Sequence, residues 1–157
     1  MRYHFRKWHV AAAAVVAAGA IAVSISGSKC HSVNGLPDLK CTPGFADSAV
    51  TQDDIQQTIC VKGYTATVRP PVSVTNTEKL QSEKDYGYPA GSQGEYDHLI
   101  PLELGGSSNT LNLWFESGPI PNAKDKVENQ LRSEVCTGKL TLAQAQKEIV
   151  TDWHTAK

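Results

Sequence analysis

Two short apolar stretches in the second half of the chain are separated by a glycine-rich turn. Asp97–Leu104 (DHLIPLEL) and Leu111–Phe115 (LNLWF) each have the length and the apolar content of a β-strand. Residues 105–109 between them read Gly-Gly-Ser-Ser-Asn, and glycines accept the positive φ angles that a tight turn requires. The pattern therefore predicts a strand, a turn and a second strand.

A helical periodicity follows the second predicted strand. Lys124–Val135 carries apolar residues at spacings of four, which places them on one helix face. Another helix is predicted to begin at Thr141, because Gln144 three residues later completes a capping box. Its apolar positions, at spacings of three and four, are Leu142, Ala145, Ile149 and Trp153. The predicted order is strand, turn, strand, helix and one more helix packed behind, which is an α+β domain.

The region before these strands is less regular. Residues 29–50 are rich in Gly, Pro, Asp and Ser and are predicted to form an irregular arm. Thr51–Ile59 is predicted to be a short helix capped by Thr51, and Val61–Val68 a short strand that ends before two prolines. Glu78–Tyr86 is polar and is predicted to be helical. Residues 51–157 are therefore expected to form the folded domain.

The first 28 residues differ in composition from the rest of the chain. A basic start without acidic residues precedes Val10–Ile25, an uncharged run of 16 residues, and small residues follow it. This order is typical of a secretory signal peptide. An uncleaved inner-membrane anchor is the alternative, although a spanning helix usually needs about 20 apolar residues. In both cases residues 29–157 are predicted to be exported, and the protein to be periplasmic or secreted unless the leader stays in the membrane.

Export changes the charge balance of the protein. The full chain has 15 basic and 16 acidic residues, and three of the basic ones lie in the leader. The remainder has 12 basic and 16 acidic residues, a net charge of −4. Proteins that bind nucleic acid normally neutralise phosphates with Lys and Arg. The composition therefore argues against nucleic-acid binding by a broadly basic surface, and it is compatible with a local basic groove.

All four cysteines lie after the leader. An even number in an exported domain indicates two disulfides, and four cysteines allow three pairings. We prefer Cys30 with Cys41 and Cys60 with Cys136, on proximity alone. A structural zinc site is not expected, because the chain contains no C-x-x-C pair.

A set of ordered motifs resembles the HNH endonuclease superfamily and its ββα-metal core, especially small exported bacterial members. The motifs, which span residues 41 to 154, are Thr58–Val61, Gly63–Thr65, Val68–Pro71, Asp97–Gly106, Asn112–Trp114, Lys124-Asp125 with Glu128, Val135-Cys136, Ala143–Gln146 and Asp152-Trp153. The resemblance implies a ββα-metal core with additional helices and a disulfide-tied N-terminal arm. It also implies a metal-dependent endonuclease that hydrolyses phosphodiester bonds.

The resemblance assigns roles to individual residues of this chain. His98 is implied as the general base, which a neutral imidazole can be near pH 7. Asp97 is implied as a metal ligand, and Asn112 as the residue whose side chain holds the loop and so orients His98. Asn122 falls at the family's third position, where it is either the second metal ligand or the N-cap of the following helix. The other acids near this helix start, read as further ligands or as groups that orient the ligands, are Asp125 and Glu128.

The expected cofactor is one divalent metal ion, with Mg²⁺ preferred and Mn²⁺, Ni²⁺ or Zn²⁺ as alternatives. No nucleotide cofactor is expected. The positive charges expected to bind phosphate are Arg69, Lys124 and Lys126. Neighbouring side chains of a regular strand point to opposite faces, so Asp97 and His98 need a strand end or a bulge to share one site.

The predicted activity is hydrolysis of DNA, with RNA as the alternative substrate. Two other interpretations stay open at the level of sequence. The chain can be a catalytically silent exported protein that binds the cell envelope or a partner, which its negative charge favours. It can also be a secreted toxin-like nuclease that is controlled by an inhibitor protein.

Overall fold

The computed structural model describes residue 27 and residues 29–157, so the predicted leader lies outside the described residues except for Gly27. The described part is a mixed fold with one two-stranded antiparallel sheet, which confirms the α+β class. The elements are η1 (Gln52–Asp54), α1 (Tyr64–Val68), α2 (Val72–Asp85), β1 (Gly94–His98), η2 (Leu102–Leu104), η3 (Thr110–Asn112), β2 (Leu113–Ser117), α3 (Lys124–Cys136) and α4 (Leu142–Asp152), where η marks a 3₁₀ turn. Within residues 29–157 no helix is long and apolar enough to cross a membrane.

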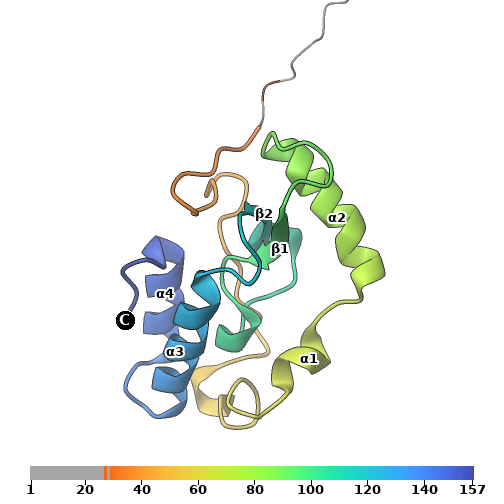
Figure 1. Ribbon diagram of the computed structural model, residues 1–157. Helices are drawn as coiled ribbons and strands as arrows, with labels where there is room; N and C mark the ends of the chain where they lie inside the picture. Colours follow the sequence, from red (N-terminus) through yellow and green to blue (C-terminus); the bar gives the residue numbers. More distant parts are fainter. Residues whose placement is uncertain (1–26, 28) are drawn as a thin grey trace, which may run out of the picture.

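The β-hairpin lies at the centre of the fold, with α2 on one side and α3 and α4 on the other (Figure 1). In the register of the hairpin Asp97 is opposite Trp114, and His98 is opposite Leu113. The predicted strand at Asp97–Leu104 is therefore wrong in position, because β1 ends at His98. The chain then turns through η2, since Pro101 has no backbone N–H for a strand ladder. The second strand likewise begins at Leu113, after the short turn η3.

The first half of the domain departs furthest from the prediction. The strand expected at Val61–Val68 is wrong, because the chain turns at Gly63 (φ 86°) and forms the short helix α1. That helix ends at Val68, and Arg69 after it is extended, as expected of a residue before proline. Instead of a helix at Thr51–Ile59, only the single turn η1 forms, although its predicted capping box is present. Helix α2 is longer than predicted and begins at Val72 rather than at residue 78.

The predicted helices of the second half are confirmed, and they form most of the larger core. Leu131 and Val135 of α3 and Ala145 and Ile149 of α4 are completely buried. The capping box of Thr141 and Gln144 starts α4 as the sequence indicated. The other buried members of this core are Val50, Ile55, Ile59, Ile100, Leu104 and Leu142. Because η2 contributes Leu104, this core holds α3 and α4 against the turn that follows β1.

Two disulfides are present, both with the predicted partners: one closes a loop within the arm, and the other joins Cys60 to the end of α3. Cys30 pairs with Cys41, and Cys60 pairs with Cys136. Residues 29–50 are also tied to the loop between the strands, because the Asp47 amide donates to the Gly105 carbonyl at 2.8 Å. The arm is therefore part of the packed structure around the hairpin.

Glycine is required at the two positions of the predicted turn for different structural reasons. Gly105 has φ of 70°, in the left-handed region that favours glycine. Gly106 is required by close approach, since a Cβ there would lie 1.7 Å from the Ile100 carbonyl oxygen. This close approach brings the chain after β1 back against itself before β2 begins.

Candidate functional site

The end of strand β1 brings Asp97 and His98 to the same place. Both residues line a cavity of about 310 Å³, although neighbouring residues of a regular strand face opposite sides. His98 is the last residue of β1, so the strand end that the sequence required is present. The two residues at the centre of the predicted site therefore share one cavity.

Most of the polar side chains around this cavity are acidic. The strand β1 forms one wall, helix α3 forms another, and η2 contributes Glu103 between them. Arg69, which follows α1, is the cationic residue among the lining side chains. The full lining is Arg69, Glu95, Tyr96, Asp97, His98, Pro101, Leu102, Glu103, Asp125, Glu128 and Asn129. This is a carboxylate-rich cavity with an imidazole at its edge.

The imidazole of His98 is almost completely buried, with 5% of its surface exposed. Its Nε2 lies 3.2 Å from the Ser108 hydroxyl. Burial lowers the pKa of His98 to about 4, and the positive charges of Arg69 and Lys124 act in the same direction against the attraction of Asp97. The ring is therefore neutral near pH 7, the state in which a histidine can accept a proton.

The carboxamide of Asn112 connects both sides of the loop that follows β1, and it is completely buried. Its Oδ1 accepts from the backbone amides of Phe45 (3.1 Å) and Ile100 (3.0 Å). Its Nδ2 donates to the carbonyls of Ile100 (2.9 Å) and Ser107 (2.8 Å). All four hydrogen-bonding positions of the side chain are thus satisfied by backbone. Asn112 fixes the loop that carries the hydrogen-bond partner of His98.

Lys124 differs from the exposed phosphate contact that the sequence suggested. Its side chain is only 2% exposed. The ammonium donates to Asp97 Oδ2 at 2.5 Å, to Glu128 Oε1 at 2.7 Å and to the carbonyl of His98 at 2.7 Å. An ammonium has three donors, so all of its hydrogens have partners in this geometry. Lys124 therefore joins the start of α3 to the end of β1 instead of facing a ligand phosphate.

Two carboxylates that the sequence analysis did not single out belong to the same cluster. Glu95 lies opposite Glu116 in the hairpin register, two residues before Asp97. One oxygen of each, Glu95 Oε1 and Glu116 Oε2, is buried without a hydrogen-bond partner among the described residues. Glu95 could have been found from the sequence, because it lies two positions before Asp97 along β1. The position of Glu116 depended on the strand pairing, which the sequence did not fix.

Lys124 favours ionisation of one acid of this cluster, Asp97, over ionisation of Glu116. Burial by itself would raise the pKa of Asp97, but the Lys124 ammonium and a hydrogen bond from Glu116 hold it below its ordinary value. Burial raises the pKa of Glu116 to about 8, and the charge of Asp97 adds to this effect. Asp97 is therefore the ionised member near pH 7, and Glu116 keeps its proton.

Of the remaining residues predicted for the site, some line the cavity and others do not. Asn122 Oδ1 accepts from the backbone amide of Lys124 at 3.0 Å, so it caps the start of α3, and it is not among the residues that line the cavity. Asp125 and Glu128 both line the cavity. Arg69 is exposed beside it, whereas Lys126 is exposed outside its lining.

The donor chemistry of the cavity fits a hard cation. Carboxylate oxygens are the ligands that Mg²⁺ prefers, and Glu95 offers a buried oxygen without a partner. Among the described residues, however, no three His, Cys, Asp or Glu side chains are gathered to hold a metal ion. Mg²⁺ commonly needs only one or two carboxylates, together with waters and substrate phosphates. A cation at this cavity would therefore depend on Asp97 and Glu95 and on oxygen atoms that do not belong to the protein.

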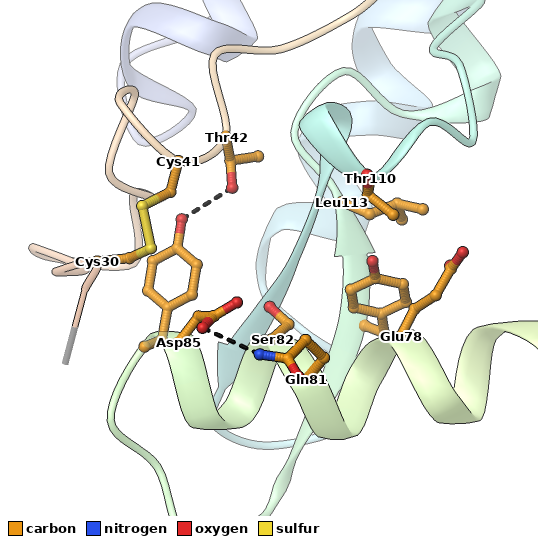
Figure 2. Close-up of a pocket in the computed structure, with 11 residues that line it drawn as sticks. Cys30, Cys41, Thr42, Glu78, Gln81, Ser82, Asp85, Thr110 and Leu113 are labelled. Carbon is orange, nitrogen blue, oxygen red and sulfur yellow. Dashed lines mark hydrogen bonds between the residues drawn. A yellow bond between two sulfur atoms is a disulfide. The ribbon is translucent and has the colours of Figure 1, made fainter. Parts of the chain in front are cut away.

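A second cavity, of about 180 Å³, lies between α2 and the disulfide-bonded arm (Figure 2). Its wall includes the disulfide of Cys30 and Cys41, and the Tyr86 hydroxyl lies 2.8 Å from the Thr42 hydroxyl. Tyr96 lines both cavities, with burial raising its pKa. Among the predicted site residues only the two cysteines line this cavity, so it belongs to the attachment of the arm.

Comparisons with protein-family models, with curated proteins and with solved structures find no match to this chain.

Proposed function

We propose that this protein is a metal-dependent endonuclease of the HNH type that hydrolyses phosphodiester bonds in DNA, with RNA as the alternative substrate. The observation that carries the proposal is the shared cavity at the end of β1, where a neutral imidazole lies beside an ionised carboxylate. Those are the two groups that water activation and cation binding require. Export to an oxidising compartment is part of the proposal and is supported by the two disulfides.

In the proposed reaction His98 takes a proton from the attacking water. The ring is neutral, and its hydrogen-bonded contact with Ser108 holds its orientation. Asn112 supports this orientation by fixing the backbone of the loop on which Ser108 lies. Water must therefore approach from the cavity side of the ring, where the phosphate would also lie.

Asp97 would hold the cation, with Glu95 as the nearest further carboxylate of the same strand. A divalent cation bound there would supply positive charge to the phosphoryl oxygens. Lys124 keeps Asp97 ionised and joins it to α3. Arg69, the cationic side chain that lines the cavity, would contact a phosphate. Asn122 has no metal-binding role in this proposal, because its carboxamide caps α3.

A second function, a catalytically silent exported protein that binds the envelope or a partner, is favoured by a different observation. The ammonium of Lys124 already occupies the space between Asp97 and Glu128 with hydrogen bonds of 2.5 and 2.7 Å. A cluster whose charges are compensated internally can be purely structural. The two functions differ in whether a divalent cation binds and in whether nucleic acid is cut.

The test is cleavage of plasmid and of total RNA by the purified, disulfide-bonded protein with Mg²⁺, Mn²⁺, Ni²⁺ or Zn²⁺. We expect His98→Ala to lower the rate by about 10² to 10⁴-fold, the usual contribution of a general base. His154→Ala is the matched control, because His154 is exposed and pairs with Asp152 instead of lining the cavity. Equal rates for His98→Ala and the wild type would refute the assignment of His98, and absence of cleavage with every metal would favour the silent function.

A further inference from the structure

The carboxylate-rich cavity adjoins a third cavity, which has the opposite charge. This third cavity, of about 250 Å³, shares Glu103 and Asn129 with the first. Its lining is Ile59, Cys60, Val61, Lys62, Gly63, Tyr64, Thr65, Glu103, Asn129 and Arg132. Its charged members apart from the shared Glu103 are therefore Lys62 and Arg132. The two cavities together form one groove with an acidic end and a basic end.

Both walls of this groove run along its full length. Helix α3 lines it from Asp125 at the acidic end, through Asn129, to Arg132 at the basic end. These residues are four and three positions apart and therefore share one helix face. Residues 61–65 and Arg69 line the groove from the other side, and η2 contacts both α1 and α3. The groove is thus built from ordered elements on each side.

The length of the groove fits a short stretch of nucleic-acid backbone. Seven residues of helix separate Asp125 from Arg132, which corresponds to about 10 Å at 1.5 Å per residue. A strand whose scissile phosphate lies beside Asp97 would bring a later phosphate of the same strand toward the basic end.

The basic end is suited to contact with a phosphate. The side chain of Lys62 is exposed, so its ammonium is accessible to a ligand. The guanidinium of Arg132 is fixed by a hydrogen bond from Nε to the Ile59 carbonyl at 2.6 Å. This bond uses one of the five N–H donors of the guanidinium and leaves the two terminal nitrogens to face a ligand. Cys60 lines the same end, and its disulfide to Cys136 ties the two walls together.

We infer that Lys62 and Arg132 form a phosphate subsite for the nucleic-acid strand that extends from the cleaved bond. This inference rests on the proposed nuclease function and specifies where the substrate strand beyond the cleaved bond is bound. It also explains how a domain with a net charge of −4 outside its leader can bind a polyanion. The attraction is local, at the end of the groove remote from the carboxylates.

The test measures binding of a fluorescently labelled dodecathymidylate by anisotropy at several salt concentrations, in chelator so that no metal-dependent cleavage occurs. We expect Lys62→Ala to weaken binding and to reduce the slope of log Kd against log salt concentration by about 1, the loss of one phosphate contact. Arg132→Gln should do the same. Lys139→Ala is the control, because Lys139 is exposed outside the lining of the groove.

Each outcome decides the inference separately from the proposed function. Equal slopes for Lys62→Ala and Lys139→Ala, or no binding by the wild type, would overturn the subsite even if the protein cuts DNA. Lower slopes for Lys62→Ala and Arg132→Gln would support the subsite even if no metal gives cleavage, and the nuclease proposal would then fail alone. If Arg132→Gln does not fold because its hydrogen bond to Ile59 is lost, the result for Lys62→Ala decides the test.

Discussion

Lys124, at the first position of α3, donates a hydrogen bond of 2.5 Å to the carboxylate of Asp97, near the end of β1. This ion pair joins the helix and the hairpin at the cavity where the proposed chemistry takes place. The same ammonium contacts the carbonyl of His98 and the carboxylate of Glu128. The geometry of the site therefore depends on a lysine that does not itself face the ligand.

Replacing Lys124 is expected to destabilise the fold strongly. Lys124→Met leaves the buried carboxylates of Asp97 and Glu128 without a counter-charge, which typically costs about 3 to 5 kcal/mol when one partner of a buried pair is removed. The free energy of unfolding in urea measures this loss. Lys126→Met, at an exposed position of the same helix, should change it by less than about 0.5 kcal/mol. Similar values for both variants would show that the ion pair is not a structural requirement.

Asn112→Ala should destabilise the domain more than the same change at Asn109. The first substitution removes four hydrogen bonds and leaves buried backbone groups unsatisfied, at about 1 to 3 kcal/mol for each such group. Asn109 is exposed and accepts one bond, from the Leu111 amide, so its loss should cost about 1 kcal/mol. Thermal unfolding of the two variants tests the difference. An equal loss in both would contradict the loop-fixing role of Asn112.

Relative to a variant without the imidazole, the stability of the protein is expected to fall between about pH 6.5 and pH 4 because of His98. Its folded-state pKa of about 4 is below the value of about 6.5 for an unfolded histidine, so the unfolded chain binds the proton first. The contribution is fully present above pH 6.5 and is lost as the pH falls. Between pH 7 and pH 4.5 we expect the stability of the wild type relative to that of His98→Asn to fall by about 2 kcal/mol.

The comparison with His98→Asn isolates this effect from the rest of the cluster. Glu116, with a pKa raised to about 8, contributes in the opposite sense, because its stabilising proton is lost as the pH rises from about 4.5 to 8. Both proteins contain Glu116, so that contribution largely cancels in the difference. Parallel pH profiles for the wild type and His98→Asn would contradict the lowered pKa.

The disulfide of Cys60 and Cys136 should stabilise the fold more than that of Cys30 and Cys41. The two bonds span sequence separations of 76 and 11 residues. In the chain-entropy treatment these separations correspond to about 4.5 and 3 kcal/mol. Urea unfolding of the two double-serine variants measures the difference. A larger loss on removal of the shorter bond would show that the packing of the arm, rather than loop closure, dominates.

Removal of divalent metal is expected to stop cleavage. The carboxylates of the cavity cannot by themselves stabilise the negative charge that develops on a phosphate, since their own charge repels it. Dialysis against chelator should abolish cutting, and added Mg²⁺ should restore it. Circular dichroism before and after dialysis controls for unfolding. Full cleavage in excess chelator would exclude the proposed cation at Asp97.

The sequence by itself determined the local features of this protein. The periodicity of α3 and α4, the capping box at Thr141, and the need for glycine at Gly105 follow from neighbours in the chain, so they could be predicted. Sequence proximity also suggested the correct disulfide partners. A shared site for Asp97 and His98 was implied by the family resemblance, on the condition that a strand ends or bulges there, and His98 is the last residue of β1.

Only the tertiary structure decided which groups from distant segments meet. The burial of Lys124 between Asp97 and Glu128 depends on how α3 crosses the end of β1, and an isolated lysine at a helix start gives no sign of it. Glu116 joined the cluster through the strand register, and α1 formed where a strand was expected because a turn at Gly63 redirected the chain. Local propensity is a weak preference that long-range packing can reverse, whereas the position of a charge relative to its partners exists only after the chain has folded.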